Sequence, residues 1–149
     1  MCWLARANPI HITEIAGDSL IYTLILNTIK KMTTKEIADR LVSMCRSGKT
    51  EEAKEELFAA DIVSIEPYEG ILPKETRGMD AIRKKAGLFV SMVENFYGDT
   101  ISEPVVAGDY FSLSWTSDLQ MKGEARKVNS ELCVYQTRDG KIISEQFFY

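Results

Sequence analysis

The chain has 149 residues, with 18 Lys and Arg against 22 Asp and Glu and a formal net charge of −4. Hydrophobic residues make up 45% and charged residues 27%, a balance that is typical of one globular domain and excludes a disordered chain. Proteins that bind nucleic acids usually carry a basic face, so we expect no nucleic-acid partner.

The chain has one histidine, His11, and three cysteines, which limits its chemistry. Catalytic triads and common zinc sites need positioned histidines, and His11 precedes the part of the chain with regular patterns. Acid–base chemistry therefore falls to carboxylates, Tyr or Lys, and we expect no metal and no cofactor. An odd number of cysteines without C-x-x-C spacing is typical of a reducing compartment, so we expect a cytoplasmic protein.

Residues 1–31 differ in pattern from the rest of the chain. Their apolar run 20–26 is far shorter than the roughly 20 residues that span a bilayer. Positive charge follows this run at Lys30 and Lys31, whereas a secretory signal carries it in front, so we expect no membrane segment. We interpret Met32 as the natural start, residues 1–31 as a leader or extension, and residues 32–149 as the domain.

Two helices are predicted directly after Met32. Thr33 and Glu36 have the spacing of a capping box, an apolar stripe follows, and Gly48 is the expected stop. A second, shorter helix is expected over about residues 50–59, with Thr50 as its cap.

A third helix over residues 79–93 has the strongest periodicity in the chain. Its apolar positions recur at helical spacing: Met79, Ile82, Ala86, Phe89, Val90 and Val93. The basic run Arg83, Lys84 and Lys85 in the same segment predicts a solvated face.

The remaining segments predict strands. A β-rich run over residues 61–67 ends at a proline, and segments 96–107, 109–121, 126–137 and 141–149 follow the third helix. Short turns join the last four segments, and Asp139-Gly140 is a strong hairpin signal. Helices followed by an antiparallel meander predict an α+β fold.

This order of elements resembles the nuclear transport factor 2-like superfamily and, more closely, its SnoaL-like branch. Three segments carry the resemblance: Ala-Asp-Ile-Val-Ser-Ile-Glu-Pro at 60–67, Arg-Gly-Met-Asp-Ala-Ile at 77–82, and the closing hairpin at 139–149. The resemblance implies a cone-shaped, cystatin-like fold, in which three helices pack on a curved antiparallel sheet around a pocket, often in a homodimer.

The resemblance does not select a function, because the superfamily includes isomerases, cyclases, dehydratases, epoxide hydrolases and non-catalytic binding proteins. Its cyclases use an acidic residue with a nearby histidine, which only His11 could supply here. Its epoxide hydrolases use an Asp-Arg-Asp arrangement, and Phe147 stands near the place of one of those acids. No catalytic residue is therefore carried over from the family.

Glu145 is the first candidate for catalysis. It lies between Ile143 and Phe147 on one strand face, with Tyr149 next in line. A carboxylate in such an apolar stripe is desolvated, which raises its pKa and suits it to act as a general acid or base. We expect Tyr hydroxyls to be its partners. In the alternative interpretation this face lies outside, or Glu145 pairs with a basic residue.

Glu131 on the preceding strand is the second candidate. In a regular hairpin Glu145 lies opposite Val134 and shares no face with Glu131, whereas a one-residue bulge places both carboxylates on one face. Both arrangements stay open at this point. Two inward carboxylates would raise the pKa of one of them.

Asp118 is the third candidate, on the polar side of the alternating strand 109–121. It serves catalysis if that side lines the pocket, and otherwise it lies on the outer face or at a dimer interface. The predicted ligand-binding residues are Trp115, Tyr135, Phe147, Tyr149 and Glu66. Trp115 and Tyr135 would alternatively fill the core, and Glu66 would be a solvated charge at the rim.

We predict a SnoaL-like protein of unknown specific function that binds a small, partly apolar molecule in a pocket and forms a homodimer. The first alternative is a cofactor-independent isomerase, cyclase or lyase that uses a carboxylate as acid and base. The second is a non-catalytic dimeric interaction module. Carboxylates that line a connected cavity would favour the pocket, and a filled interior would favour the module.

Overall fold

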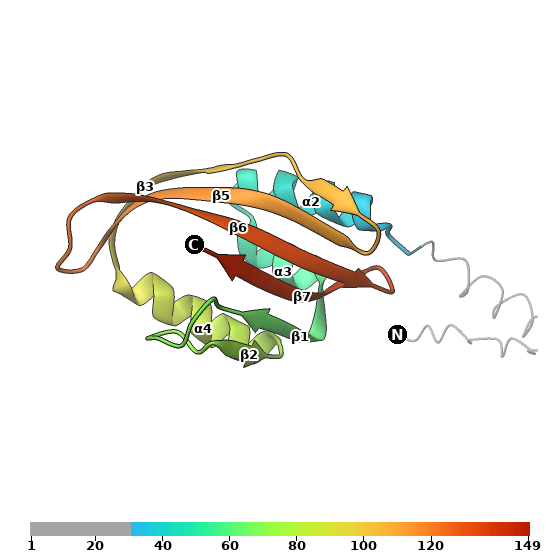
Figure 1. The fold of residues 1–149 in the computed structure, drawn as a ribbon, viewed down its shortest axis with the longest axis horizontal. Helices are drawn as coiled ribbons and strands as arrows, with labels where there is room; N and C mark the ends of the chain where they lie inside the picture. Colours follow the sequence, from blue (N-terminus) through green and yellow to red (C-terminus); the bar gives the residue numbers. More distant parts are fainter. Residues whose placement is uncertain (1–30) are drawn as a thin grey trace, which may run out of the picture. The chain divides into compact units, whose positions relative to one another are not determined.

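Three helices and a seven-stranded sheet make up residues 31–149, the part of the chain that the computed structural model describes (Figure 1). By internal contacts the chain divides at Lys30. The leader predicted over residues 1–31 lies outside the described residues except for Lys31, as does His11, and this interpretation stays a prediction.

The first two helices follow local sequence signals. Helix α2 (Thr34–Arg46) begins with the predicted capping box: the Thr33 hydroxyl accepts from the Glu36 amide at 3.2 Å, and the Glu36 carboxylate accepts from the Thr33 amide at 2.7 Å. Gly48, with φ 72°, follows its end as predicted. Helix α3 (Thr50–Leu57) differs from the prediction at its start, because Thr50 is its first helical residue and no side chain caps it.

Helix α4 (Met79–Met92) forms where the periodicity predicted it, but most of its apolar stripe lies outside the core. Only Ile82 is fully buried, while Phe89 is 40% exposed and Val90 is 67% exposed. The prediction of a solvated basic face is wrong for Lys85, whose side chain is 10% exposed and points inward. The stripe therefore faces a space that the protein does not fill.

The sheet has the strand order β2-β1-β7-β6-β5-β3, with β4 paired to β5. Its strands are β1 (Phe58–Ile65), β2 (Glu75–Arg77), β3 (Val93–Ile101), β4 (Val105–Ala107), β5 (Tyr110–Met121), β6 (Lys127–Arg138) and β7 (Lys141–Phe148). The predicted α+β class and the curved sheet are confirmed (Figure 1).

Two features of the sheet go beyond the predicted antiparallel meander. Strand β1 pairs with β7 in parallel. This direction is possible because a long part of the chain, and not a short turn, connects the two strands. The expected segment 96–107 divides into β3 and β4 around Pro104, which has no amide to donate. Strand β2 lies between the predicted strand 61–67 and the third helix, where no strand was predicted, because a strand of three residues is too short to show alternation.

A bulge in the last hairpin sets the register of β7. Asp139 and Gly140 both have positive φ, 55° and 80°, as a two-residue turn requires, and Arg138 pairs with Lys141. The pairs then shift at Ile143, which has no partner, so that Glu145 lies opposite Tyr135. The bulged alternative is therefore the one that the chain adopts.

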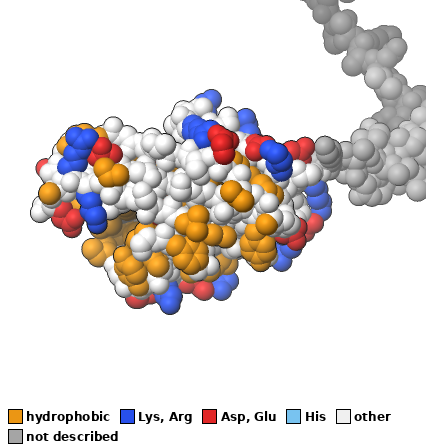
Figure 2. All heavy atoms as spheres, turned by 45° about the horizontal axis from the view of Figure 1, so that its top comes forward, with side chains coloured by type: hydrophobic (Ala, Val, Ile, Leu, Met, Phe, Trp, Pro, Cys, Tyr) orange, Lys and Arg blue, Asp and Glu red, His pale blue; other side chains and the backbone are white. Residues whose placement is uncertain are grey.

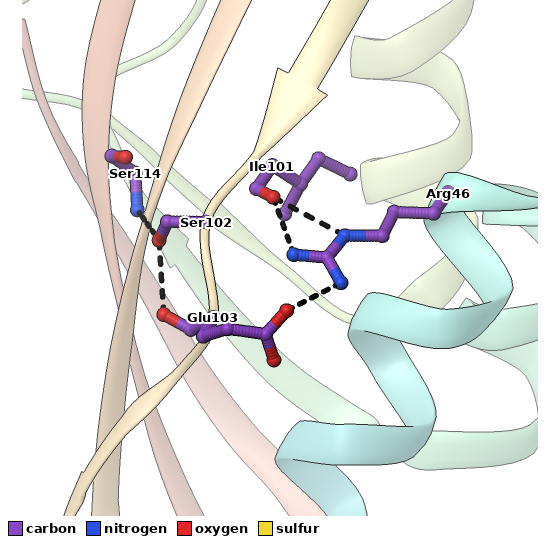
Figure 3. Close-up of polar contacts among 5 residues, drawn as sticks. All are labelled: Arg46, Ile101, Ser102, Glu103 and Ser114. Atoms are coloured by element: carbon purple, nitrogen blue, oxygen red, sulfur yellow. Dashed lines mark hydrogen bonds and ion pairs between the residues drawn. The ribbon is translucent and has the colours of Figure 1, made fainter.

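Arg46, the last residue of α2, anchors this helix to the end of β3 (Figure 3). Its guanidinium donates to the Ile101 carbonyl at 2.7 and 3.2 Å and to the Glu103 carboxylate at 2.6 Å. Ser102 beside it accepts from the Ser114 amide at 3.0 Å, which ties the same bend to β5. These contacts fix α2 against one end of the sheet.

The apolar core lies between α2, α3 and the sheet. Its fully buried large side chains include Ile37, Leu57, Ile62, Phe111 and Ile142. Elsewhere apolar groups reach the surface, and Figure 2 shows them gathered over part of one face of the molecule. The core therefore occupies only one part of the space that the sheet encloses.

Two glycine substitutions should change stability in opposite directions. Gly140→Ala should lower the free energy of unfolding by roughly 1–2 kcal/mol, because φ is 80° and a Cβ would stand 3.2 Å from that of Lys31. Gly87→Ala, inside α4 with open space around it, should raise it by roughly 0.5–1 kcal/mol. Urea unfolding followed by circular dichroism measures both, and equal effects would contradict the turn geometry.

Candidate functional site

A cavity of about 940 Å³ lies between α4 and the inner face of the sheet. Helices α2 and α3, strands β1, β3, β5, β6 and β7 and the segment after β1 also contribute to its wall. The apolar part of the lining comes mainly from α4, β3 and β5, with Ile82, Phe89, Val90, Val93, Phe96, Leu119 and Met121. The stripe of α4 that the core leaves open thus lines the cavity.

An ion pair forms the polar end of the cavity. Lys85 from α4 binds the carboxylate of Glu66, which directly follows β1, and the side chains are 10% and 6% exposed. The Tyr149 hydroxyl donates to the other Glu66 oxygen at 3.1 Å. Glu66 is therefore a buried, paired group and not the solvated rim charge of the alternative interpretation.

Lys85 has two further neighbours. Its ammonium donates to the Ser64 hydroxyl at 2.8 Å and lies 5.2 Å from the centre of the Phe147 ring. Ser64 lies on β1 and Phe147 on β7, so one lysine links the helix to two neighbouring strands. This arrangement satisfies a charge that would otherwise be costly to bury.

Glu145 points into the same region and is 7% exposed. Burial raises its pKa, while a hydrogen bond with Ser64 and the positive charge of Lys85 lower it, and burial has the larger effect. The expected partner was a Tyr hydroxyl, but Tyr149 binds Glu66 instead. The reason is that β7 pairs with β1, which brings Ser64 directly beside Glu145.

Glu131 lines the cavity from β6, on the same face as Glu145 because of the bulge. The pKa of Glu131 is raised to about 7, mainly by burial: a hydrogen bond from the Cys133 thiol lowers it, and the negative charges of Glu66 and Glu145 raise it. The carboxyl is therefore half ionised near neutral pH. A group of this kind accepts or donates a proton under the same conditions.

Aromatic side chains form the walls between the two ends. Trp115 on β5 pairs with Glu131 in register and donates its indole N–H to Asp99 at 3.1 Å. Tyr135 stacks on Phe111, with ring centres 4.7 Å apart, and is 4% exposed. Trp115 and Tyr135 both line the cavity, and Tyr135 is also part of the core.

Asp118 does not join this group, in contrast to its prediction as a catalytic candidate. It lies on the other face of β5, where Arg126 donates to its two oxygens at 2.8 and 2.5 Å. The hydrogen bond from Arg126 holds the pKa of Asp118 below its usual value. The apolar side of β5 faces inward, so its polar side carries Asp118 outward.

Lys85 is the site residue that the sequence interpretation missed. A run of three basic residues on a helix is usually solvated. A signal was nevertheless present, because Lys85 stands three residues after Ile82 and four before Phe89, within the apolar stripe. A charge inside a stripe indicates a buried, paired group, as it does for Glu145.

The fold and the site together define a SnoaL-like, nuclear transport factor 2-like α+β protein with a cavity lined by carboxyl groups. The SnoaL-like domain model matches residues 32–149, and the chain belongs to this family. No curated protein matches the chain by sequence.

Solved structures with the same fold include a candidate SnoaL-like polyketide cyclase from Mesorhizobium loti. It is 31% identical, with 79% of this chain and 100% of that chain covered and a TM-score of 0.74. A ketosteroid isomerase-like protein from Catenulispora acidiphila, in complex with trimethylamine, is 24% identical, with 78% and 87% covered and a TM-score of 0.60. IdmH, a candidate polyketide cyclase from Streptomyces antibioticus, is 17% identical, with 78% and 91% covered and a TM-score of 0.59. The last two show the fold alone.

Two further findings concern residues 31–149 only. Within them no helix is both long and apolar enough to cross a bilayer. The same residues hold no group of three or more His, Cys, Asp or Glu side chains arranged to bind a metal ion.

The Glu131 carboxyl should titrate with a pKa of about 7 in a carbon-13 NMR titration. Glu145→Gln should lower this pKa, because it removes a negative charge that repels the ionised form. The exposed Glu124→Gln serves as the control and should leave it unchanged. A Glu131 carboxyl at the ordinary value would contradict the geometry.

The same group should make stability depend on pH. The pKa of Glu131 in the folded state lies above its unfolded value of about 4.3. The contribution of Glu131 to the free energy of unfolding is therefore complete below about pH 4.3 and is lost as the pH rises to about 7. Glu131→Gln removes this loss. The change that it makes in the free energy of unfolding should be more stabilising at pH 8 than at pH 4, by on the order of 2 kcal/mol. Unfolding by urea at both pH values measures this difference.

Proposed function

We propose that this protein binds a small, partly apolar molecule in the cavity between α4 and the sheet. The observation that supports this most directly is the cavity of about 940 Å³ with apolar walls and one polar end. Glu131 and Glu145 both line it, which is the arrangement expected of a pocket and not of a filled interaction module.

The lining suggests how such a molecule would lie. Trp115 and Phe147 offer ring faces and edges to its apolar part. Its polar group would meet Glu131 and Glu145, while Glu66 and Tyr149 bind each other and complete the wall. Pockets for small molecules usually combine mostly apolar walls with a few polar groups in this way.

Binding of N-phenyl-1-naphthylamine, a neutral apolar fluorescent probe, tests this proposal. We expect one saturable site and a rise in probe fluorescence. Ala86→Trp, which places a large ring in the cavity, should weaken binding by about tenfold or more. Lys84→Trp, at an exposed position on the same helix, is the matched control and should not. Equal affinities for both variants would contradict binding in this cavity.

Cofactor-independent acid–base catalysis is the second candidate function, as an isomerase, cyclase or lyase. It is favoured by one observation, the pKa of about 7 at Glu131 next to a second buried carboxyl, Glu145. An ionised Glu131 would remove a proton beside a carbonyl and, once protonated, would return that proton to another atom of the same molecule. The 31% identical protein from Mesorhizobium loti carries the description of a polyketide cyclase candidate, which fits this chemistry. Glu131 titrating at its ordinary pKa would remove this candidate.

We also propose that the protein is a homodimer through the outer face of the sheet. Leu132 and Phe148 form a cross-strand pair there and are 45% and 46% exposed. Exposed apolar pairs on a broad sheet face are typical of subunit interfaces.

Sedimentation should therefore give a dimer at micromolar concentration. Leu132→Glu should shift it to a monomer, because it places a charge in the exposed apolar pair. Ile71→Glu, at a loop position that is 74% exposed, is the control and should leave the dimer intact. A wild-type monomer at this concentration would contradict the proposal.

The sequence interpretation supports two further proposals. Residues 32–149 form the functional domain and residues 1–31 a leader or extension, because the capping box follows Met32 directly. N-terminal sequencing of the native protein would decide this. The cysteine pattern supports a cytoplasmic location.

A further inference from the structure

The lysines near the polar end of the cavity already have partners. Lys85 binds Glu66 and the Ser64 hydroxyl. Lys54, whose side chain is 16% exposed, pairs with Glu51 at 2.7 Å. Within residues 31–149, no positive charge at this end is therefore left for a ligand.

The other ionisable side chains that face this end are acidic or neutral. Glu131 and Glu145 are carboxyl groups, and Tyr149 donates its proton to Glu66. Lys127 also lines the cavity, but it is exposed and belongs to the first position of β6, four residues from Glu131. That separation along a strand corresponds to about 13 Å.

An anion that entered the cavity would lose its hydration and meet carboxyl groups instead of a free cation. Removing an ion from water is costly unless a partner of opposite charge replaces the lost hydration. A neutral molecule has no such cost and gains the apolar walls. The selectivity depends on Glu66, because without its negative charge the buried ammonium of Lys85 would need another anion.

We infer that Glu66 is a specificity-determining residue that neutralises Lys85 and thereby closes the cavity to anions. This inference rests on the proposed function, since it concerns the ligand of the same cavity. The geometry supports it at both ends of the pair: Tyr149 holds one Glu66 oxygen at 3.1 Å, and Ser64 holds the ammonium at 2.8 Å.

Two fluorescent probes of similar shape and different charge test the inference. N-phenyl-1-naphthylamine is neutral, and 8-anilinonaphthalene-1-sulfonate adds one negative charge to the same ring system. The wild-type protein should bind the neutral probe about tenfold or more tighter than the sulfonate. Similar affinities of the wild-type protein for both probes would overturn the inference.

Glu66→Gln keeps the shape of the side chain and removes its charge. Its affinity for the sulfonate, relative to that for the neutral probe, should rise by about tenfold or more. The double variant Glu66→Gln with Lys85→Met should lose this gain. Glu75→Gln, an exposed residue that pairs with Arg77, is the matched control and should resemble the wild type. A Glu66→Gln protein that still rejects the sulfonate would overturn the inference.

One outcome separates this inference from the proposed function. Absence of binding of the neutral probe to the wild type would contradict the proposed function itself. If Glu66→Gln does not fold, Lys85→Met alone gives a second measurement. Its affinity for the sulfonate should be no lower than that of the wild type, and a loss of about tenfold would show that Lys85 binds anions and overturn the inference.

Discussion

The position of one unpaired residue, Ile143, decides which side chains of the last strand face the cavity. Strand side chains alternate between faces, so a shift of one residue exchanges the inner and outer sets. The Asp139-Gly140 turn fixes the first pair of the hairpin, and the bulge then moves Glu145 opposite Tyr135. In a regular ladder Glu145 would lie on the outer face, and the cavity would lose one of the carboxyl groups that line it.

The polar end of the cavity also holds the helix on the sheet. Of the side chains of α4, only Ile82 is fully buried, so apolar packing contributes little to its position. Lys85 makes up for this by binding Glu66 and Ser64 near the end of β1 and by lying over the Phe147 ring of β7. Breaking a buried pair by removing one partner typically costs about 3–5 kcal/mol, which is large beside the stability of a domain. Site and helix position therefore depend on the same contacts.

Local patterns were sufficient for most of the fold and for part of the site. The capping box at Thr33, the hairpin turn at Gly140 and the alternation of β5 each depend on residues within a few positions, so they are readable from sequence. The parallel pairing of β1 with β7 depends on contacts between residues some 80 positions apart, and no local signal carries it. The bulge at Ile143 is of the same kind, since either register satisfies the turn.

The site followed the same division. Glu131 and Glu145 were predicted as candidates because they are carboxylates in strands with apolar residues, and both line the cavity. Asp118 was a candidate on the polar side of its strand, and it lies outward because the inner face of β5 is apolar. Lys85 was missed because a run of three basic residues predicts an exposed face. That prediction holds for Arg83 and Lys84 but not for Lys85, which points inward.

The two ends of the cavity differ in how firmly they are held, and this bears on ligand entry. At the polar end, ionic and hydrogen-bonded contacts cross-link α4, β1 and the C-terminal residue. At the apolar end, Phe89, Val90 and Phe96 line the cavity while they are 40%, 67% and 60% exposed. Few buried contacts oppose movement there, and local opening takes least free energy where such contacts are few. If the cavity binds a small molecule as proposed, the route of least resistance lies between the end of α4 and β3, and the polar group of the ligand would reach the carboxyl groups last.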